Sequence, residues 1–229
     1  MAEPDDPHGS PQSGSPQSGS PQSGSPQSGS PQSWSQAHHG IDPAAVPFVS
    51  GWLRVVDVAA RPLVAARVPP DAVTAAGLLA SLAVPVFAAG GQLILAIAAV
   101  AVSVLLDGVD GAVAQQSNRV SSYGRALDST CDRVAELAWW VALVLATGLP
   151  AWQAGVIAVI TLAMEGWRAA SGCLGRLTVW ERPTRTILVV VGLAAAGFGL
   201  SGVTGAVGMV LAATGAGQLA GAARRAHGS

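Results

Sequence analysis

Four aspartates lie close together in an apolar part of the chain, at spacings that could build a metal site. Asp107 and Asp110 are three residues apart, and Asp128 and Asp132 are four apart. In a helix, either spacing places both side chains on one face. The polar segment 115–124 contains a glycine and would let two helices pack antiparallel, so that all four carboxylates converge. Carboxylates this close repel one another, and hard divalent cations such as Mg²⁺ or Mn²⁺, which prefer oxygen ligands, relieve the repulsion.

The alternative interpretation is a set of solvated carboxylates at two helix ends. It accounts for one or two acids, but not for pairs at both helical spacings. Acidic residues inside membrane spans are costly and usually mark function. Gly111 and Ala114 keep the facing surface small, which lets a bulky ligand or a neighbouring backbone approach closely. The pattern therefore favours a functional site.

The composition is that of a membrane protein with a polar extension. Hydrophobic residues make up 50% of the 229 residues and charged residues only 11%, whereas soluble domains are about one quarter charged. All 12 basic residues are arginine, which excludes a lysine nucleophile or Schiff base. The net charge of −1 gives no indication of a nucleic-acid partner.

Six segments are apolar enough to predict membrane spans, each of which needs about 20 residues. They are Ala72–Ala89, Gln92–Leu106, Leu127–Thr147, Ala151–Ala170, Thr186–Leu200 and Val203–Ala222, and the second helix can continue to Ala114. Arginines gather before the first span, around the second and fourth links, and after the sixth. The positive-inside rule then places both termini and the aspartates at the cytoplasmic side of the cell membrane.

Three regions follow from this pattern, within an all-α integral membrane fold of six transmembrane helices preceded by an interfacial helix. Residues 1–48 hold a Ser/Pro/Gln/Gly repeat without apolar side chains to bury, so we expect a disordered tail. Residues 49–68 predict an amphipathic juxtamembrane helix in the inner interface, with a simple connecting helix as the alternative. Residues 69–229 form the six-helix domain. Trp180 and other tryptophans near span ends are typical of interfacial belts.

The aspartate pattern resembles the signature of CDP-alcohol phosphotransferases, D-x-x-D-G-x-x-A-R, eight residues, G-x-x-x-D-x-x-x-D. The chain matches seven of the eight fixed positions of this signature at the right spacing, from Asp107 through Gly124 to Asp132. Gln115 is the one departure, because it stands where the family usually has arginine. Glutamine donates hydrogen bonds to a phosphate but does not neutralise it.

The resemblance implies a metal-dependent transferase that moves a phosphatidyl group from a CDP-alcohol such as CDP-diacylglycerol to an alcohol and releases CMP. In the family, two divalent ions clamp the donor's pyrophosphate. Residue by residue, it implies that Asp107, Asp110, Asp128 and Asp132 bind the metals and that Asp132 is also the base. It also implies that the CDP group of the donor is bound by Thr74, Gly111, Ala114, Gln115 and Gly124. The family is commonly homodimeric.

The acceptor is indicated by a further resemblance to the bacterial phosphatidylinositol phosphate synthases within this family. Pro70-Asp71-Ala72-Val73-Thr74 and Leu127-Asp128-Ser129-Thr130-Cys131-Asp132-Arg133 are similar to that subgroup. So is the arginine-proline element Glu181-Arg182-Pro183, which continues to Arg185. This implies that Arg168, Arg182 and Arg185 bind a phosphorylated polyol such as inositol phosphate. Three alternatives remain: phosphatidylglycerophosphate synthase-type activity, a membrane cation transporter, and a non-enzymatic scaffold.

Overall fold

The computed structural model describes residues 47–171, 178–199 and 203–227. Within these ranges every regular element is a helix: α2 (Pro47–Ala65), α3 (Pro70–Ala89), α4 (Leu93–Gln116), α5 (Ser122–Thr147), α6 (Ala151–Ser171), α7 (Arg182–Gly197) and α8 (Val203–His227). The all-α prediction is confirmed for this part of the chain. Most of the predicted tail lies outside the described residues.

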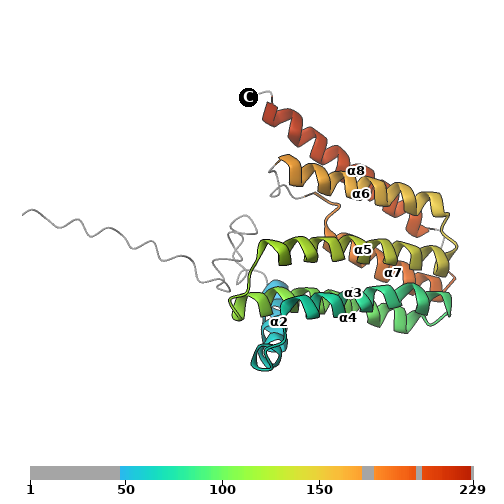
Figure 1. Cartoon of the computed structure of the whole chain (residues 1–229). Helices are drawn as coiled ribbons and strands as arrows, with labels where there is room; N and C mark the ends of the chain where they lie inside the picture. The colour runs from blue at the N-terminus through green and yellow to red at the C-terminus, as the bar shows by residue number, and fades with distance from the viewer. Residues whose placement is uncertain (1–46, 172–177, 200–202, 228–229) are drawn as a thin grey trace, which may run out of the picture.

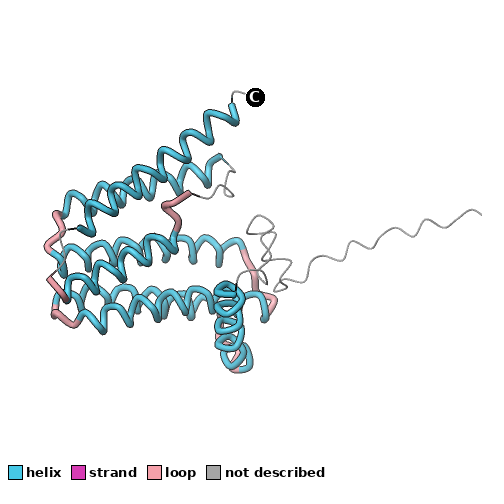
Figure 2. The backbone as a smooth tube through the Cα atoms, turned by 180° about the vertical axis from the view of Figure 1, so that it is seen from behind, coloured by secondary structure: helices cyan, strands magenta, loops and turns pink. Residues whose placement is uncertain are grey.

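Helices α3 to α8 run alongside one another, and α2 lies across one end of this bundle (Figure 1). Helix α3 packs on both α4 and α5, α7 packs on α4 and α5, and α6 packs on α8. Seen from behind, α2 again crosses the other helices at the end where the link between α4 and α5 lies (Figure 2). The aspartate-bearing ends of α4 and α5 therefore meet at the end of the bundle that α2 covers.

Local sequence signals set the ends of the helices that carry the aspartates. Helix α4 ends at Gln116. Two residues later, Asn118 adopts a left-handed φ of 55°. Helix α5 begins after Ser121, whose hydroxyl accepts a hydrogen bond from the Gly124 amide at 2.9 Å. This N-cap satisfies one of the free donors of the first turn. The second predicted span does continue beyond Asp107, as expected.

Helix α2 approaches the backbone of α4 closely between the first two aspartates. A Cβ atom added at Gly108 would lie 2.9 Å from Val56 Cγ2 and 3.4 Å from Trp52. A larger side chain at this position would push Val56 aside, so Gly108 permits this contact. The Gln116 amide also donates to Asp57 Oδ1 at 2.9 Å. Helix α2 is thus attached along the segment of α4 that carries Asp107 and Asp110.

The main core lies among α3 to α8 and contains Trp139 and Trp140. The interfacial position expected for Trp180 is wrong, because its side chain is fully buried and stacks on Trp140 with the ring centroids 6.3 Å apart. Its indole nitrogen donates to Thr161 Oγ1 at 2.8 Å. The segment before α7 folds inward between neighbouring helices, and the hydrogen bond satisfies the indole there.

Three helices of the described residues are long and apolar enough to cross a membrane: Pro70–Ala89, Leu93–Gln116 and Val203–Arg224. By length and composition these support a membrane protein. The other predicted spans, in α5, α6 and α7, carry charged residues such as Glu136, Glu165 and Arg185. These side chains pair with one another inside the bundle. Helix α7, with 16 residues, is also shorter than the about 20 residues that a span needs.

Candidate functional site

Three of the four predicted aspartates converge in the structure. Asp107 on α4 and Asp128 and Asp132 on α5 each present a carboxylate oxygen, and these oxygens lie within 4.8 Å of one another. The spacing of four residues on α5 puts both of its aspartates on the face that meets α4. The carboxylates line a pocket formed by Thr74, Gly77, Leu78, Ser103, Asp107, Asp110, Asp128, Cys131, Asp132, Ala135 and Arg182.

Asp110 also lines this pocket, but it faces α3 and stands apart from the cluster of three. Its carboxylate accepts a hydrogen bond of 2.5 Å from Thr74 Oγ1, and its exposed fraction is 5%. The sequence predicted that Thr74 contacts the nucleotide, and in the structure this hydroxyl orients Asp110. One residue can serve both purposes, because a hydroxyl donates one hydrogen bond and still accepts others.

The residues of the cluster fit a divalent cation. All three offer carboxylate oxygens, the ligand type that Mg²⁺ and Mn²⁺ prefer. The three oxygens already lie within 4.8 Å of one another, so movements of the side chains alone could bring them to one ion. A bound divalent ion would supply the charge that neutralises a phosphate group in this pocket.

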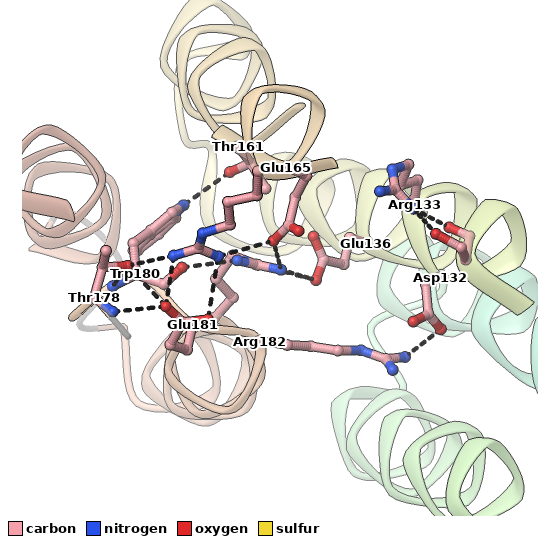
Figure 3. A network of polar contacts seen from close by, with 12 residues as sticks. Asp132, Arg133, Glu136, Thr161, Glu165, Thr178, Trp180, Glu181 and Arg182 are labelled. Carbon is pink, nitrogen blue, oxygen red and sulfur yellow. Dashed lines mark hydrogen bonds and ion pairs between the residues drawn. The ribbon is translucent and has the colours of Figure 1, made fainter. Parts of the chain in front are cut away.

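Arg182 joins the aspartate cluster from α7 (Figure 3). Its Nη1 lies 2.7 Å from Asp107 Oδ2, and its Nη2 lies 2.6 Å from Asp132 Oδ1. One guanidinium thereby bridges α4 and α5. Of the three arginines predicted for the acceptor, this is the one that the structure brings to the carboxylates.

Arg185 lies deeper, one turn further along α7. Its Nη2 is 2.8 Å from Glu136 Oε1 and 3.3 Å from Glu165 Oε1, and its Nη1 donates to the Trp180 carbonyl at 2.8 Å. Its exposed fraction is 5%. Its charge is thus neutralised by two glutamates from α5 and α6, and it ties three helices together.

Arg168 belongs to the same polar network. Its Nη2 donates to Glu181 Oε1 at 2.6 Å and to Thr178 Oγ1 at 3.0 Å. Burial alone would raise the pKa of Glu181, but hydrogen bonds from the Thr178 amide and hydroxyl and from Arg168 hold that pKa below its ordinary value. Glu181 is therefore an anion at neutral pH and fixes the start of α7. Its partners are Thr178, three residues before it, and Arg168, thirteen residues before it.

Apart from Thr74 on α3, the predicted donor-site residues occupy the ends of α4 and α5 that meet at the link. Gly111 has open space beside it, since no atom lies within 4 Å of an added Cβ. At Gly124 such an atom would lie 3.1 Å from Ser121 Oγ. Ala114 is half-buried and Gln115 is exposed on the last turn of α4. The space at Gly111 and the exposed amide of Gln115 are compatible with a nucleotide beside the carboxylates.

Comparison with known proteins identifies the family of the chain. Residues 67–216 match the family described as CDP-alcohol phosphatidyltransferase. The phosphatidylinositol phosphate synthase of Mycobacterium marinum is 35% identical over 168 residues, which cover 66% of this chain and 70% of that protein. The archaetidylinositol phosphate synthase of Methanothermobacter thermautotrophicus is 32% identical over 128 residues, which cover 54% of this chain and 65% of that protein.

Two solved structures have the same fold. Both are crystal structures of the Mycobacterium tuberculosis phosphatidylinositol phosphate synthase, at 26% identity. The complex with manganese and citrate gives a TM-score of 0.63 and covers 71% of this chain and 86% of that one. The structure with CDP-DAG bound gives 0.61 and covers 73% and 90%.

Proposed function

Because this chain belongs to the CDP-alcohol phosphatidyltransferase family, we propose that Asp107, Asp110, Asp128 and Asp132 form its catalytic centre. The enzyme transfers a phosphatidyl group from a CDP-alcohol to an alcohol and depends on divalent metal. The observation that carries the assignment is the convergence of three carboxylates and one arginine in a single pocket. Solvated carboxylates at separate helix ends would not share a pocket.

Each aspartate has a role that suits its surroundings. Asp107 and Asp128 would hold divalent ions from two different helices, and Asp110, held by Thr74, would complete the ligand set. Asp132 accepts the proton of the attacking acceptor hydroxyl. A carboxylate general base must lie within hydrogen-bond reach of that hydroxyl, and Asp132 lines the same pocket as the metal ligands. Gly111, Ala114, Gln115 and Gly124 surround the CDP group.

We propose CDP-diacylglycerol as the donor and inositol phosphate as the acceptor. A relative of this fold binds CDP-DAG, and relatives at 33–35% identity are phosphatidylinositol phosphate synthases. Within the chain, Arg182 is the acceptor-binding arginine that reaches the catalytic pocket. Arg168 and Arg185 contribute to acceptor binding by fixing the start of α7, from which Arg182 extends.

CMP release from CDP-diacylglycerol, measured with a panel of acceptors, tests this assignment. We expect kcat/KM for inositol phosphate to exceed that for unphosphorylated inositol by about tenfold to a hundredfold, because a hydrogen bond to a charged group contributes about 1.5–3 kcal/mol. A preference for glycerol 3-phosphate would assign phosphatidylglycerophosphate synthase-type activity instead. Absence of CMP release with every acceptor would favour a scaffold, and cation flux in vesicles would favour a transporter.

The proposed membrane arrangement has six spans in residues 69–229 and the tail of residues 1–48 in the cytoplasm. The juxtamembrane helix predicted at residues 49–68, most of which belongs to α2, lies in the inner interface. The arginine distribution supports cytoplasmic termini and a cytoplasmic active site in the cell membrane. The outer face of α2 presents Arg54, Val58 and Arg61, which suits an anionic membrane surface. The family resemblance supports a homodimer, which light scattering of the detergent-solubilised protein would check.

Single cysteines report the orientation. In a background with both native cysteines replaced by serine, Pro150→Cys should react with an impermeant thiol reagent from outside the cell, and Val120→Cys should not. Both positions are exposed and avoid the left-handed backbone at Gly148, whose φ is 68°. Labelling of Val120→Cys alone would reverse the topology and move the aspartates to the outer surface.

A further inference from the structure

The guanidinium of Arg182 forms ion pairs with two of the three clustered carboxylates that are proposed to hold metal. It contacts Asp107 through Nη1 and Asp132 through Nη2, at 2.7 and 2.6 Å. These distances are those of charge-assisted hydrogen bonds, which are the strong ones in proteins. Asp128 is the third member of the cluster, and the two ion pairs of Arg182 go to the other members. Asp107 and Asp132 are therefore both partners of the Arg182 guanidinium and proposed ligands of a divalent ion.

The base of the Arg182 side chain is fixed, whereas its end can move. Glu181 precedes it and is bound by Arg168 and Thr178, and the Arg182 carbonyl accepts a hydrogen bond from Thr186 Oγ1 at 3.0 Å. The side chain is 28% exposed and extends away from this network across the pocket (Figure 3). Rotation about its side-chain bonds can redirect the guanidinium without moving α7.

A divalent cation and the guanidinium compete for this position. When ionised, the three carboxylates carry three negative charges, of which Arg182 can neutralise one. An ion placed among the three oxygens would meet the guanidinium at short range, where two positive charges repel strongly in a partly buried site. Both cations cannot keep their full sets of contacts with Asp107 and Asp132.

We propose that Arg182 is an exchangeable counter-ion of the metal centre. It bridges Asp107 and Asp132 before a divalent cation binds, gives up at least one of them when the cation binds, and then presents its guanidinium to the acceptor phosphate. Metal binding thereby prepares the acceptor site, so the acceptor binds after the metal. The inference rests on the proposed function, in which these aspartates hold metal.

A different role for Arg182 predicts the opposite result. If the guanidinium were a permanent bracket that keeps Asp107 and Asp132 in position, its removal would weaken metal binding. If it is a competitor, its removal frees both carboxylates and strengthens metal binding. The sign of the change in affinity therefore separates the two roles.

The experiment measures Mn²⁺ binding to the full chain in detergent, without substrates, from the electron paramagnetic resonance signal of free Mn²⁺. We expect the dissociation constant of Arg182→Gln to be about tenfold lower than that of the wild type, since a charge-assisted contact no longer has to be broken. Arg182→Lys keeps the charge but loses the fork that bridges two carboxylates, so its value should lie between the two.

Arg133→Gln is the matched control, because Arg133 follows Asp132 directly yet donates to the Ser129 carbonyl and hydroxyl of its own helix. It removes one positive charge near the cluster without removing a contact to the cluster, and its dissociation constant should change less than about twofold. An unchanged or higher value in Arg182→Gln, with melting temperatures matched to the wild type, would overturn the inference. An equal change in Arg133→Gln would do so too, since it would reduce the effect to net charge.

Failure of the proposed metal centre would look different. Asp128→Asn removes a ligand that Arg182 does not contact, so it should weaken Mn²⁺ binding whichever role Arg182 has. If Asp128→Asn binds Mn²⁺ as the wild type does, the metal centre itself is misplaced. If Asp128→Asn loses Mn²⁺ binding while Arg182→Gln has the dissociation constant of the wild type, the metal centre is supported and only the proposed role of Arg182 is wrong.

Discussion

Replacing Asp132 with Asn should lower the rate of CMP release by at least about a thousandfold while the protein stays in the membrane. A general base contributes about a hundredfold to ten-thousandfold, and Asn has the shape of Asp but cannot take up the proton. The substitution also removes one of three clustered metal ligands and one partner of Arg182. Because Asp107 and Asp128 are also clustered metal ligands, Asp107→Asn and Asp128→Asn should each abolish turnover.

The measurement is the initial rate of CMP release at saturating Mn²⁺ and substrates, with the amount of membrane-inserted protein determined for each variant. Asp57→Asn is the matched control, because Asp57 lies on α2 and contacts Arg61 and Gln116 outside the pocket. It should keep its rate within about twofold, as is usual for exposed ion pairs. Near-normal turnover in any two of the three pocket variants would disprove the site assignment.

Replacing Arg185 with Ala should lower the free energy of unfolding by about 3–5 kcal/mol, the usual cost of removing one partner of a buried ion pair. The change leaves Glu136, whose side chain is 10% exposed, without its cation. It also removes the contact to Glu165 and the hydrogen bond to the Trp180 carbonyl. Helices α5, α6 and α7 lose the residue that joins them.

Unfolding in mixed detergent, followed by circular dichroism, measures this loss. Arg61→Ala serves as the control, since Arg61 pairs with Asp57 on an exposed helix surface and such pairs contribute at most about 1 kcal/mol. Adding Glu136→Gln to Arg185→Ala should restore part of the stability, because the unpaired charge is then gone. A loss below about 1 kcal/mol for Arg185→Ala would show that Arg185 is free to bind an acceptor.

The sequence by itself determined the chemistry of the centre and the elements that carry it. Helical spacing alone put Asp128 and Asp132 on one face, and the antiparallel link brought Asp107 to them. Long apolar runs predicted the helices, and the second was expected to continue past Asp107 to Ala114, two residues short of the observed end of α4 at Gln116. Local rules suffice for these features, because hydrogen bonding within a helix and the cost of burying charge depend on neighbouring residues.

Only the tertiary structure decided how the arginines and the fourth aspartate are partnered. The sequence grouped Arg168, Arg182 and Arg185 together, but packing directs Arg182 to the aspartates of α4 and α5 and gives the other two to glutamates. Asp110, one turn from Asp107, faces Thr74 on α3 instead of joining the cluster. Each buried charge or polar group must find its partner on whichever helix lies opposite. That choice depends on contacts between residues far apart in the chain, on which spacing carries no information.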